Sequence, residues 1–438
     1  MGLFGSTNTK KIKPAKRLAG TLRLPGDKSI SHRYAMLASI ADGPSEIHFF
    51  SPAADCQSTL DCLAKLGAEI KRENQTVKIR GRGLRGLRAS AAALDAGNSG
   101  STVRMLSGIL AAQPFRSMLT GDASLSRRPM KRVVEPLSRM GARIRTGEGG
   151  RLPLEIDPAD ADGLKPTRYE LPVASAQVKS AILLAGLYAR GETEVIEPAA
   201  TRDHTEIALE QMGADIGRHG RTIAVRGPAR LEGRKLYVPG DISSAAFFLA
   251  AGLIVPASSL VLQNVGLNPT RTELLDLLVR TGGRVRVQDP DVLNGELLGD
   301  VRVESSRLEG GEIAPDSVPG LIDELPVLAV LGTQTKRGLS FHGAQELRVK
   351  ESDRIAAVAE NLRRMGAEVE EFADGLAVQG KQRLRGAEVE SYGDHRIAMA
   401  FAVAGLVAEG TTTIRDSACV DISFPGFFDV LASVVESA

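Results

Sequence analysis

The chain has 438 residues, of which 43% are hydrophobic and 25% are charged. It is long enough for roughly two to four globular domains, and its composition excludes a disordered or fibrous protein. Lys and Arg together number 55, against 53 for Asp and Glu, so the formal net charge is only +2. A chain this balanced has no overall field to hold nucleic acid or an anionic membrane. Aromatic residues, at 4% with no tryptophan, are also too few to stack bases. Binding of anions must therefore depend on local clusters.

Cysteine content and the apolar runs indicate a protein of a reducing compartment. The three cysteines, Cys56, Cys62 and Cys419, are too few for a disulfide framework, and their spacing fits no zinc pattern. No apolar run approaches the roughly 18–20 residues of a membrane span, and the N-terminus lacks the apolar core of a signal peptide. Residues 1–6 match a short myristoylation pattern, which we interpret instead as part of a basic tail that ends near Arg17. We expect a cytoplasmic protein that does not bind membranes.

A short phrase recurs along the chain. It has a leucine, then three residues, a glycine, a small residue and, two positions later, Ile or Val; the glycines are at positions 67, 141, 213, 282 and 366. Each copy predicts the last turn of an amphipathic helix, a glycine that ends the helix, and the start of a strand. A sixth helix is expected at 427–435, where the chain ends.

A second phrase alternates with the first. Short polar segments open helical runs that are apolar nearly all round, so these helices should be buried. The segments are Gly26-Asp-Lys-Ser, Gly97-Asn-Ser-Gly-Ser, Ala174-Ser-Ala-Gln, Gly240-Asp-Ile-Ser-Ser, Leu321-Ile-Asp-Glu and Gly393-Asp-His-Arg. Strand-like pieces such as 76–79, 222–225 and 411–414 fill the gaps. The sequence therefore predicts six α/β units of about 70 residues, each with two helices and several short strands.

Six units suggest two lobes of three. We expect the sixth unit to lack strands after its last helix, whereas the chain begins with a spare strand-like piece at 17–24. If this piece completes the lobe that contains the sixth unit, the chain starts in that lobe, forms the other lobe and then returns to the first. The pairs Pro25-Gly26 and Pro239-Gly240 are the natural crossover points. The lobes would then be 1–25 with 240–438, and 26–239.

The residues that open the apolar helices indicate anion binding. A helix N-terminus offers free backbone N–H groups and the positive end of the helix dipole. Ser, Asn and Asp at such positions can also be simple N-caps, and for Ser243 and Ser244 we favour that interpretation. It fails for Lys28 and Arg396, because a cation at a helix N-terminus opposes the dipole and needs an anion nearby.

Two further clusters of charge support an anion site. Arg127 and Arg128 follow each other in a short loop. Arg348, Lys350, Glu351 and Arg354 lie within seven residues, and on a helix the second and fourth of these would share a face. The basic run at 82–88 lacks aromatic residues, so we interpret it as a solvated turn and strand edge.

Four long segments carry a family resemblance: Leu24-Pro-Gly-Asp-Lys-Ser-Ile-Ser-His-Arg33, Gly97-Asn-Ser-Gly-Ser-Thr-Val-Arg104, Arg348-Val-Lys-Glu-Ser-Asp-Arg354 and Gly393-Asp-His-Arg396. In these segments and their order, from about Lys16 to Phe428, the chain resembles the EPSP synthase (3-phosphoshikimate 1-carboxyvinyltransferase) family. Segments 174–181, 201–205 and 322–324 are similar to the second class of that family. The resemblance implies a two-lobed inside-out α/β barrel, each lobe of three βαβαββ repeats with buried parallel helices, and an active site in the cleft between the lobes.

The resemblance also implies a reaction of the shikimate pathway of aromatic amino-acid biosynthesis. The enolpyruvyl group of phosphoenolpyruvate is transferred to the 5-hydroxyl of shikimate 3-phosphate through a tetrahedral intermediate, with no metal or organic cofactor. Asp323 would accept a proton, Glu351 would donate one, and Lys28 would contact both substrates and assist proton transfer. The implied shikimate 3-phosphate ligands are Lys28, Ser29, Arg33, Ser175, Gln177, Arg202, Asp323 and Lys350. The implied phosphoenolpyruvate ligands are Lys28, Gly100, Arg128, Gln177, Arg354 and Arg396, with His395 nearby.

Two positions depart from the family pattern. Some members carry a lysine where this chain has Ile422, and many carry a second serine where it has Ala176. One cation and one phosphate contact are therefore missing or replaced. Without the resemblance, Asp323 could be a helix cap and Glu351 a surface partner of Arg354.

Two alternatives to this function stay open. The related transferase that acts on UDP-N-acetylglucosamine typically has a cysteine in its reactive loop, and the corresponding residues 116–128 contain none. A non-catalytic repeat scaffold would lose Lys28, Asp323 or Glu351, and all three are present. We expect a monomer whose partners are the two small substrates, with no nucleic acid bound.

Overall fold

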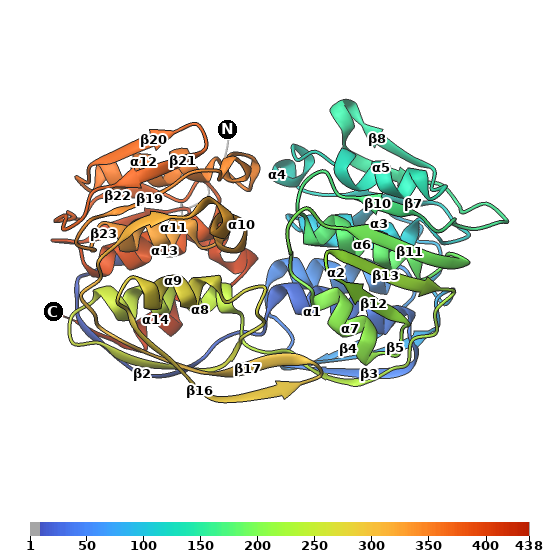
Figure 1. Ribbon diagram of the computed structural model, residues 1–438, viewed down its shortest axis with the longest axis horizontal. Helices are drawn as coiled ribbons and strands as arrows, with labels where there is room; N and C mark the ends of the chain where they lie inside the picture. The colour runs from blue at the N-terminus through green and yellow to red at the C-terminus, as the bar shows by residue number, and fades with distance from the viewer. Residues whose placement is uncertain (1–8, 438) are drawn as a thin grey trace, which may run out of the picture. The chain divides into compact units, whose positions relative to one another are not determined.

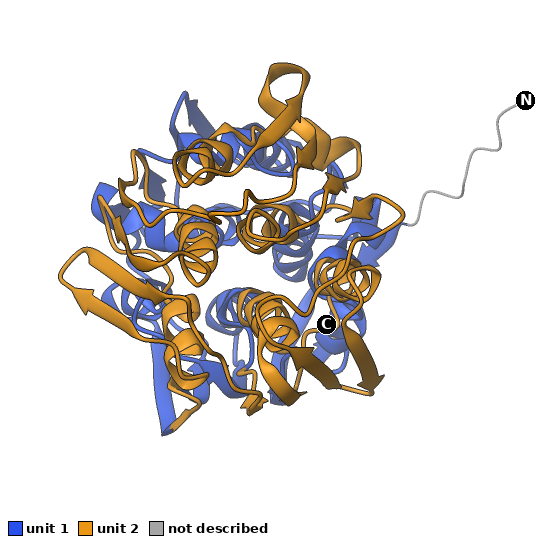
Figure 2. Ribbon diagram, turned by 90° about the vertical axis from the view of Figure 1, so that its right-hand side faces the viewer, with its two compact units in different colours: residues 1–25, 240–291, 297–438 blue, residues 26–239, 292–296 orange. Residues whose placement is uncertain are grey.

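The computed structural model describes residues 9–437, so the pattern at 1–6 lies outside the described residues. The chain divides into two compact units (Figure 2). Unit 1 comprises Met1–Pro25, Gly240–Asp291 and Leu297–Ala438, and unit 2 comprises Gly26–Pro239 and Val292–Glu296. No helix in the described part of the chain is long and apolar enough to cross a membrane.

Unit 2 repeats one arrangement three times. In each repeat an apolar helix is followed by a strand, an amphipathic helix and two more strands. The elements are α1 (Lys28–Ile40), β3 (Asp42–His48), α2 (Ala54–Lys65), β4 (Glu69–Glu73), β5 (Thr76–Arg82); β6 (Leu94–Asp95), α3 (Gly100–Leu110), β7 (Ser117–Thr120), α4 (Ala123–Ser126), α5 (Lys131–Arg139), β8 (Ile144–Gly147), β9 (Arg151–Ile156); β10 (Arg168–Glu170), α6 (Ala176–Gly186), β11 (Gly191–Ile196), α7 (His204–Gln211), β12 (Ile216–His219), β13 (Thr222–Gly227); and β14 (Lys235–Tyr237).

The first two repeats of unit 1 follow the same order, and in the third a single strand follows the last helix. Its elements are β1 (Lys10–Ile12), β2 (Ala15–Arg23); α8 (Ile242–Ile254), β15 (Ser259–Gly266), α9 (Glu273–Arg280), β16 (Arg284–Leu293), β17 (Glu296–Glu304); β18 (Gly311–Ile313), α10 (Val318–Leu321), α11 (Leu325–Gly332), β19 (Leu339–Phe341), α12 (Arg354–Arg364), β20 (Val369–Phe372), β21 (Gly375–Val378); β22 (Glu388–Glu390), α13 (His395–Leu406), β23 (Thr412–Arg415), α14 (Phe427–Ala432) and β24 (Val435–Ser437). Within this unit the sheets lie outside and the helices inside (Figure 1).

The strands of residues 9–437 form six small sheets, and none of them closes into a barrel. In unit 2 each sheet joins a parallel pair to two antiparallel strands, as in the order β10-β11-β13-β12. The first sheet of unit 2 takes its parallel strand from β14, where Lys235 pairs with Glu46. The corresponding sheet of unit 1 takes it from β2, where Ala19 pairs with Ser259. The predicted α/β class with βαβαββ repeats is therefore confirmed.

The expected ends of the sixth unit were partly wrong. Its last helix stops at Ala432, and a short strand, β24, follows and pairs antiparallel with β2. The N-terminal strand begins at Ala15, and β1 before it pairs with β23. The N-terminal segment thus contributes to two sheets of unit 1.

The five recurrent glycines end amphipathic helices, as predicted. Glycines 67, 141, 213, 282 and 366 follow α2, α5, α7, α9 and α12 and have φ between 84° and 99°. Side chains other than hydrogen are strained in this left-handed region, which explains why glycine recurs there.

The apolar helices make up the core of each unit, as their sequences indicate. Every residue of α13 is buried, and α3 and α6 pack against each other in unit 2. At Gly108 of α3 an added Cβ would lie 2.1 Å from the carbonyl oxygen of Ala181 on α6, so only glycine permits this close approach. Several helices of unit 2 are seen nearly end-on in Figure 2, which shows that they run side by side.

A buried polar chain crosses the core of unit 2. His32 Nδ1 lies 2.7 Å from Thr59 Oγ1, which lies 2.6 Å from Thr102 Oγ1. Thr102 donates to Ser99 Oγ, the N-cap of α3. Burial lowers the pKa of His32 well below its ordinary value, and the nearby charges of Lys28 and Arg33 lower it further.

We predict that this histidine makes the protein less stable in acid. The unfolded chain takes up a proton on His32 near pH 6.5, whereas the folded chain does so only at lower pH. The free energy of unfolding should therefore fall by up to about 1.4 kcal/mol per pH unit below pH 6.5 from this group alone. Urea unfolding between pH 7.5 and 5 should show a shallower decline for His32→Asn than for the wild type. His219→Asn, at an exposed position, is the control. Equal slopes for the wild type and His32→Asn would contradict the prediction.

Candidate active site

Three helix N-termini come together in unit 2. The N-caps of α1, α3 and α6 are Asp27, Ser99 and Ser175, and each accepts a hydrogen bond from a backbone N–H of its own first turn. Arg104 Nη1 on α3 donates to Gln177 Oε1 on α6 over 2.8 Å, and Gln177 Nε2 donates to Ser101 Oγ over 2.9 Å. These bonds hold the first turns of α3 and α6 together.

Cationic side chains lie around the first turn of α1. Lys28 Nζ is 2.9 Å from Asp55 Oδ2, and Arg202 Nη1 is 3.3 Å from Ser29 Oγ. Arg33 is buried and donates to Thr205 Oγ1, Ser180 Oγ and the carbonyl oxygen of Ser29. Burial lowers the pKa of Arg33 to about 10. Its contacts brace Ser29 and α6, while Lys28 and Arg202 retain partial exposure.

Gly100 makes room for two guanidinium groups. A Cβ at this position would lie 2.7 Å from Arg104 Nη1 and 3.5 Å from Arg128 Nη1. Arg128 is 9% exposed and donates to Asn98 Oδ1 over 3.1 Å. The N-terminus of α3 therefore carries two cations beside a backbone without a side chain, a surface suited to a small anion.

The helix N-termini of unit 1 surround a carboxylate. Asp323 precedes α11, and three cationic side chains approach its carboxylate: Arg354 at 3.4 Å, Arg396 at 3.8 Å and Lys350 at 3.9 Å. Arg396 Nη1 also donates to the carbonyl oxygen of Asp323 over 2.8 Å. Asp323 does not serve as the N-cap of α11, a position taken by Glu324.

Arg354 is buried between carboxylates. Its Nε donates to Asp394 Oδ2 over 2.8 Å, and its Nη2 donates to Glu351 Oε2 over 2.5 Å. Burial lowers the pKa of Arg354, but attraction to Asp394, Glu351 and Asp323 outweighs burial and raises the pKa above its ordinary value. Glu351 thus lies beside Arg354 as expected from their spacing, at a partly buried position rather than on an open surface.

The interpretation of Ser243 as an N-cap was wrong. Asp241 is the N-cap of α8 and accepts from the backbone N–H of Ser243. The Ser243 hydroxyl donates instead to Glu324 and accepts from Arg271 over 2.7 Å. Asp241 is the N-cap in place of Ser243 because it lies two positions earlier, where its carboxylate reaches the first turn of α8.

Several residues of these clusters were not singled out from the sequence. They are Asp55, Arg104, Arg271, Glu324 and Asp394, which pair with predicted site residues or brace them. A charged residue at the start of an apolar helix was the available signal for Glu324 and Asp394. Asp55 and Arg271 lie elsewhere in the repeats and carry no such signal.

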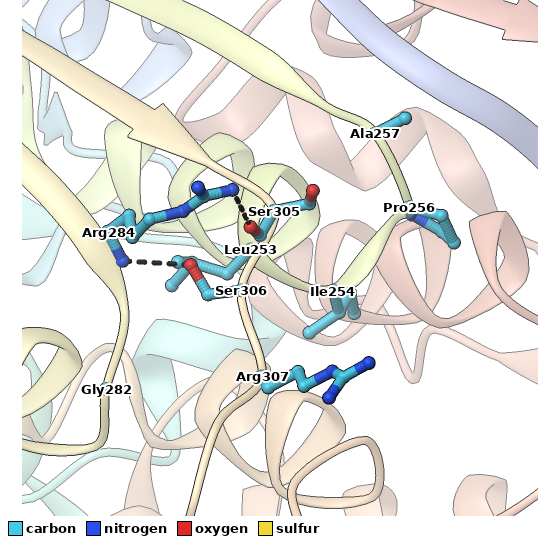
Figure 3. A pocket seen from close by; sticks show the side chains of 9 residues that line it. All are labelled: Leu253, Ile254, Pro256, Ala257, Gly282, Arg284, Ser305, Ser306 and Arg307. Atoms are coloured by element: carbon cyan, nitrogen blue, oxygen red, sulfur yellow. Dashed lines mark hydrogen bonds between the residues drawn. The ribbon is translucent and has the colours of Figure 1, made fainter.

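A pocket of about 570 Å³ in unit 1 lies apart from these clusters. Leu253, Ile254 and Pro256 contribute to its apolar lining, and Arg284, Ser305, Ser306 and Arg307 contribute to its polar lining (Figure 3). Arg284 donates to the carbonyl oxygen of Ser305, and the pocket contains none of the predicted site residues. Among residues 9–437, no group of three or more His, Cys, Asp or Glu side chains could hold a metal ion.

Comparison with known proteins gives one consistent result. The family model of EPSP synthase (3-phosphoshikimate 1-carboxyvinyltransferase) matches residues 12–431. The chain is 54% identical to the 3-phosphoshikimate 1-carboxyvinyltransferase of Solibacter usitatus (strain Ellin6076), covering 98% of this chain and 100% of that protein. It is 52% identical to the same enzyme of Koribacter versatilis (strain Ellin345), covering 97% and 99%. A solved structure of EPSP synthase from Acinetobacter baumannii is similar with a TM-score of 0.88, 42% identity and 99% coverage of both chains.

Proposed function

The chain belongs to the EPSP synthase family, and from this we propose that it transfers the enolpyruvyl group of phosphoenolpyruvate to the 5-hydroxyl of shikimate 3-phosphate. This is a step of the shikimate pathway. The observation that carries the assignment to particular residues is the Asp323 carboxylate, which three cationic side chains approach within 3.9 Å. The free cysteines are compatible with a reducing compartment, and we place the enzyme in the cytoplasm as a monomer.

We assign the addition step to residues of unit 1. Asp323 accepts the proton of the 5-hydroxyl as its oxygen forms a bond to C2 of phosphoenolpyruvate. Glu351 donates a proton to the methylene carbon, which becomes a methyl group, and a tetrahedral intermediate results. In the elimination step a basic group takes a proton from the methyl group, and the C–H electron pair forms the carbon–carbon double bond again. The bond from C2 to the phosphate oxygen breaks, and phosphate leaves with the electron pair of that bond. General acid–base catalysis of this kind contributes about 10²–10⁴-fold to a rate.

The cations bind the anionic groups of the two substrates in this proposal. Lys28 contacts both substrates. Shikimate 3-phosphate also contacts Ser29, Arg33, Ser175, Gln177, Arg202, Asp323 and Lys350, and phosphoenolpyruvate contacts Gly100, Arg128, Gln177, Arg354 and Arg396. Guanidinium groups suit this role because their paired N–H donors match the geometry of carboxylate and phosphate.

The test is release of phosphate by the purified protein. Shikimate 3-phosphate and phosphoenolpyruvate are supplied together and each is omitted in turn, with EDTA present throughout. We expect release that requires both substrates and is unaffected by the chelator. Release with UDP-N-acetylglucosamine in place of shikimate 3-phosphate would assign the other transferase activity, and no release from a folded protein would favour a non-catalytic scaffold.

A further inference from the structure

The segment that carries Arg202 has two buried carboxylates at its ends. It runs between β11 and α7, and residues 198–200 at its tip are exposed. Glu197 at its start and Glu206 in the first turn of α7 are buried, with 6% and 1% of their surface exposed. An exposed irregular segment of this kind would be mobile unless it were attached to the core.

A buried lysine on α6 joins both ends. Lys179 has no exposed surface, and its Nζ lies 2.7 Å from Glu206 Oε1 and 3.1 Å from Glu197 Oε1. It also donates to the carbonyl oxygen of Thr201 over 3.5 Å, and the Thr201 hydroxyl donates to Glu197. Among the described residues, all hydrogen-bond and ion-pair partners of the Lys179 ammonium therefore lie at 197–206.

Stability alone does not explain why the Lys179 ammonium is buried with two carboxylates. Removing an ammonium and two carboxylates from water is costly, and apolar residues of similar volume often replace buried ion pairs without loss of stability. Burial raises the pKa of Glu206 above its ordinary value, and attraction to Lys179 opposes this. Glu206 Oε2 has no hydrogen-bond partner in the described chain, so the cluster leaves one acceptor of this buried carboxylate unsatisfied.

The position of Lys179 indicates what the cluster fixes. It follows Ser175 and Gln177 on the same helix, and all three lie within the first four residues of α6 or its N-cap. Arg202 lies one residue after Thr201, and its guanidinium reaches Ser29 on α1. Attachment of 197–206 to α6 thus sets where Arg202 lies relative to Ser175, Gln177 and Ser29.

We propose that Lys179 is a positioning residue that fixes Arg202 for the phosphate of shikimate 3-phosphate. The proposal rests on the proposed function and adds to it a residue that does not contact substrate. It predicts that the effects of Lys179 and Arg202 on the affinity for shikimate 3-phosphate are coupled rather than independent.

The experiment is a double-mutant cycle on binding of shikimate 3-phosphate, measured by calorimetry in the absence of phosphoenolpyruvate. One charge-assisted hydrogen bond corresponds to roughly 10–100-fold in affinity, so Arg202→Met should raise Kd by about that factor. Lys179→Met should raise Kd by about tenfold or more while kcat and KM for phosphoenolpyruvate change little. The double variant should bind no more weakly than Arg202→Met, because the guanidinium that Lys179 positions is already absent.

Gln113→Met is the matched control. Gln113 is a buried residue of unit 2 whose amide donates to Tyr188 Oη and to the carbonyl oxygens of Leu84 and Ile109, away from 197–206. Its loss should lower thermal stability and leave Kd unchanged. If Lys179→Met does not fold, Lys179→Met with Glu206→Gln removes the opposite charge as well, and the cycle is repeated in that background.

The outcomes separate the two proposals. A wild-type protein that does not bind shikimate 3-phosphate overturns the proposed function and this inference with it. A wild type that binds, with Lys179→Met binding equally well, overturns the inference alone. The same holds if the losses of Lys179→Met and Arg202→Met multiply in the double variant, because independent effects indicate that the lysine has only a structural role.

Discussion

Replacement of Asp323 by asparagine should reduce kcat by about 10²–10⁴-fold, the usual contribution of a general base. Asparagine keeps the size of the side chain and one acceptor oxygen toward Arg354, Arg396 and Lys350, but it cannot take up the proton of the 5-hydroxyl. The affinity for shikimate 3-phosphate should therefore stay within a few-fold of the wild type. Steady-state kinetics and calorimetric binding of the substrate to each variant measure the two effects separately.

Asp316→Asn provides the control for this change. Asp316 lies seven positions earlier in the same unit and is exposed, so its variant should match the wild type in both measurements. An Asp323→Asn enzyme with wild-type kcat would remove Asp323 from the proton transfer. Parallel loss of kcat and of binding would instead make Asp323 mainly a substrate ligand.

The repeats were predictable because the features that define each of them depend on residues close together in the sequence. A glycine at the end of a helix and an apolar run after a short polar opening are decided within a few residues, so all five recurrent glycines and the six apolar helices were found. The strand β24 was missed because three residues, Val435–Ser437, are too few to show alternation, and their pairing with β2 joins the two ends of the chain.

Membership of the clusters was predictable only in part. The openings of the apolar helices indicated Lys28, Asp323 and Arg396, because a charge at a helix N-terminus is visible in the sequence. Which groups pair was not visible, since Arg354 and Asp394 are 40 positions apart and Arg202 and Ser29 are 173 apart. Such pairs depend on how the repeats stack, which local patterns do not encode.

The same limit applies to buried charges. In the sequence, Lys179 is one polar residue in an apolar helix, and Glu197 and Glu206 resemble surface residues at the ends of a loop. Their burial and contact become evident only in the folded unit. The segment Val292–Glu296 shows this most clearly, because it includes the last two residues of β16, a strand that otherwise belongs to unit 1, but packs in unit 2, where Glu296 lies 2.8 Å from His204.

Arg354→Met should destabilise unit 1 and abolish turnover. Arg354 is 2% exposed and forms ion pairs with Asp394, Glu351 and Asp323, so its loss leaves the buried Asp394 carboxylate without its cation. Breaking a buried pair by removal of one partner costs about 3–5 kcal/mol. Urea unfolding should show a loss of this size, and phosphate release should fall to background. Arg307→Met, at an exposed arginine of the same unit, should change stability by no more than about 0.5 kcal/mol.

A second variant separates the structural effect from the catalytic one. Asp394→Asn removes the most buried of the three carboxylates, and asparagine remains a good N-cap for α13. Arg354→Met with Asp394→Asn should therefore recover part of the lost stability, because less negative charge is left unpaired. Turnover should not return, since the guanidinium of Arg354 is no longer present to bind phosphoenolpyruvate beside Asp323 and Glu351. Recovery of activity together with stability would mean that Arg354 has only a structural role. Wild-type stability in Arg354→Met alone would show that the buried Asp394 carboxylate does not depend on Arg354.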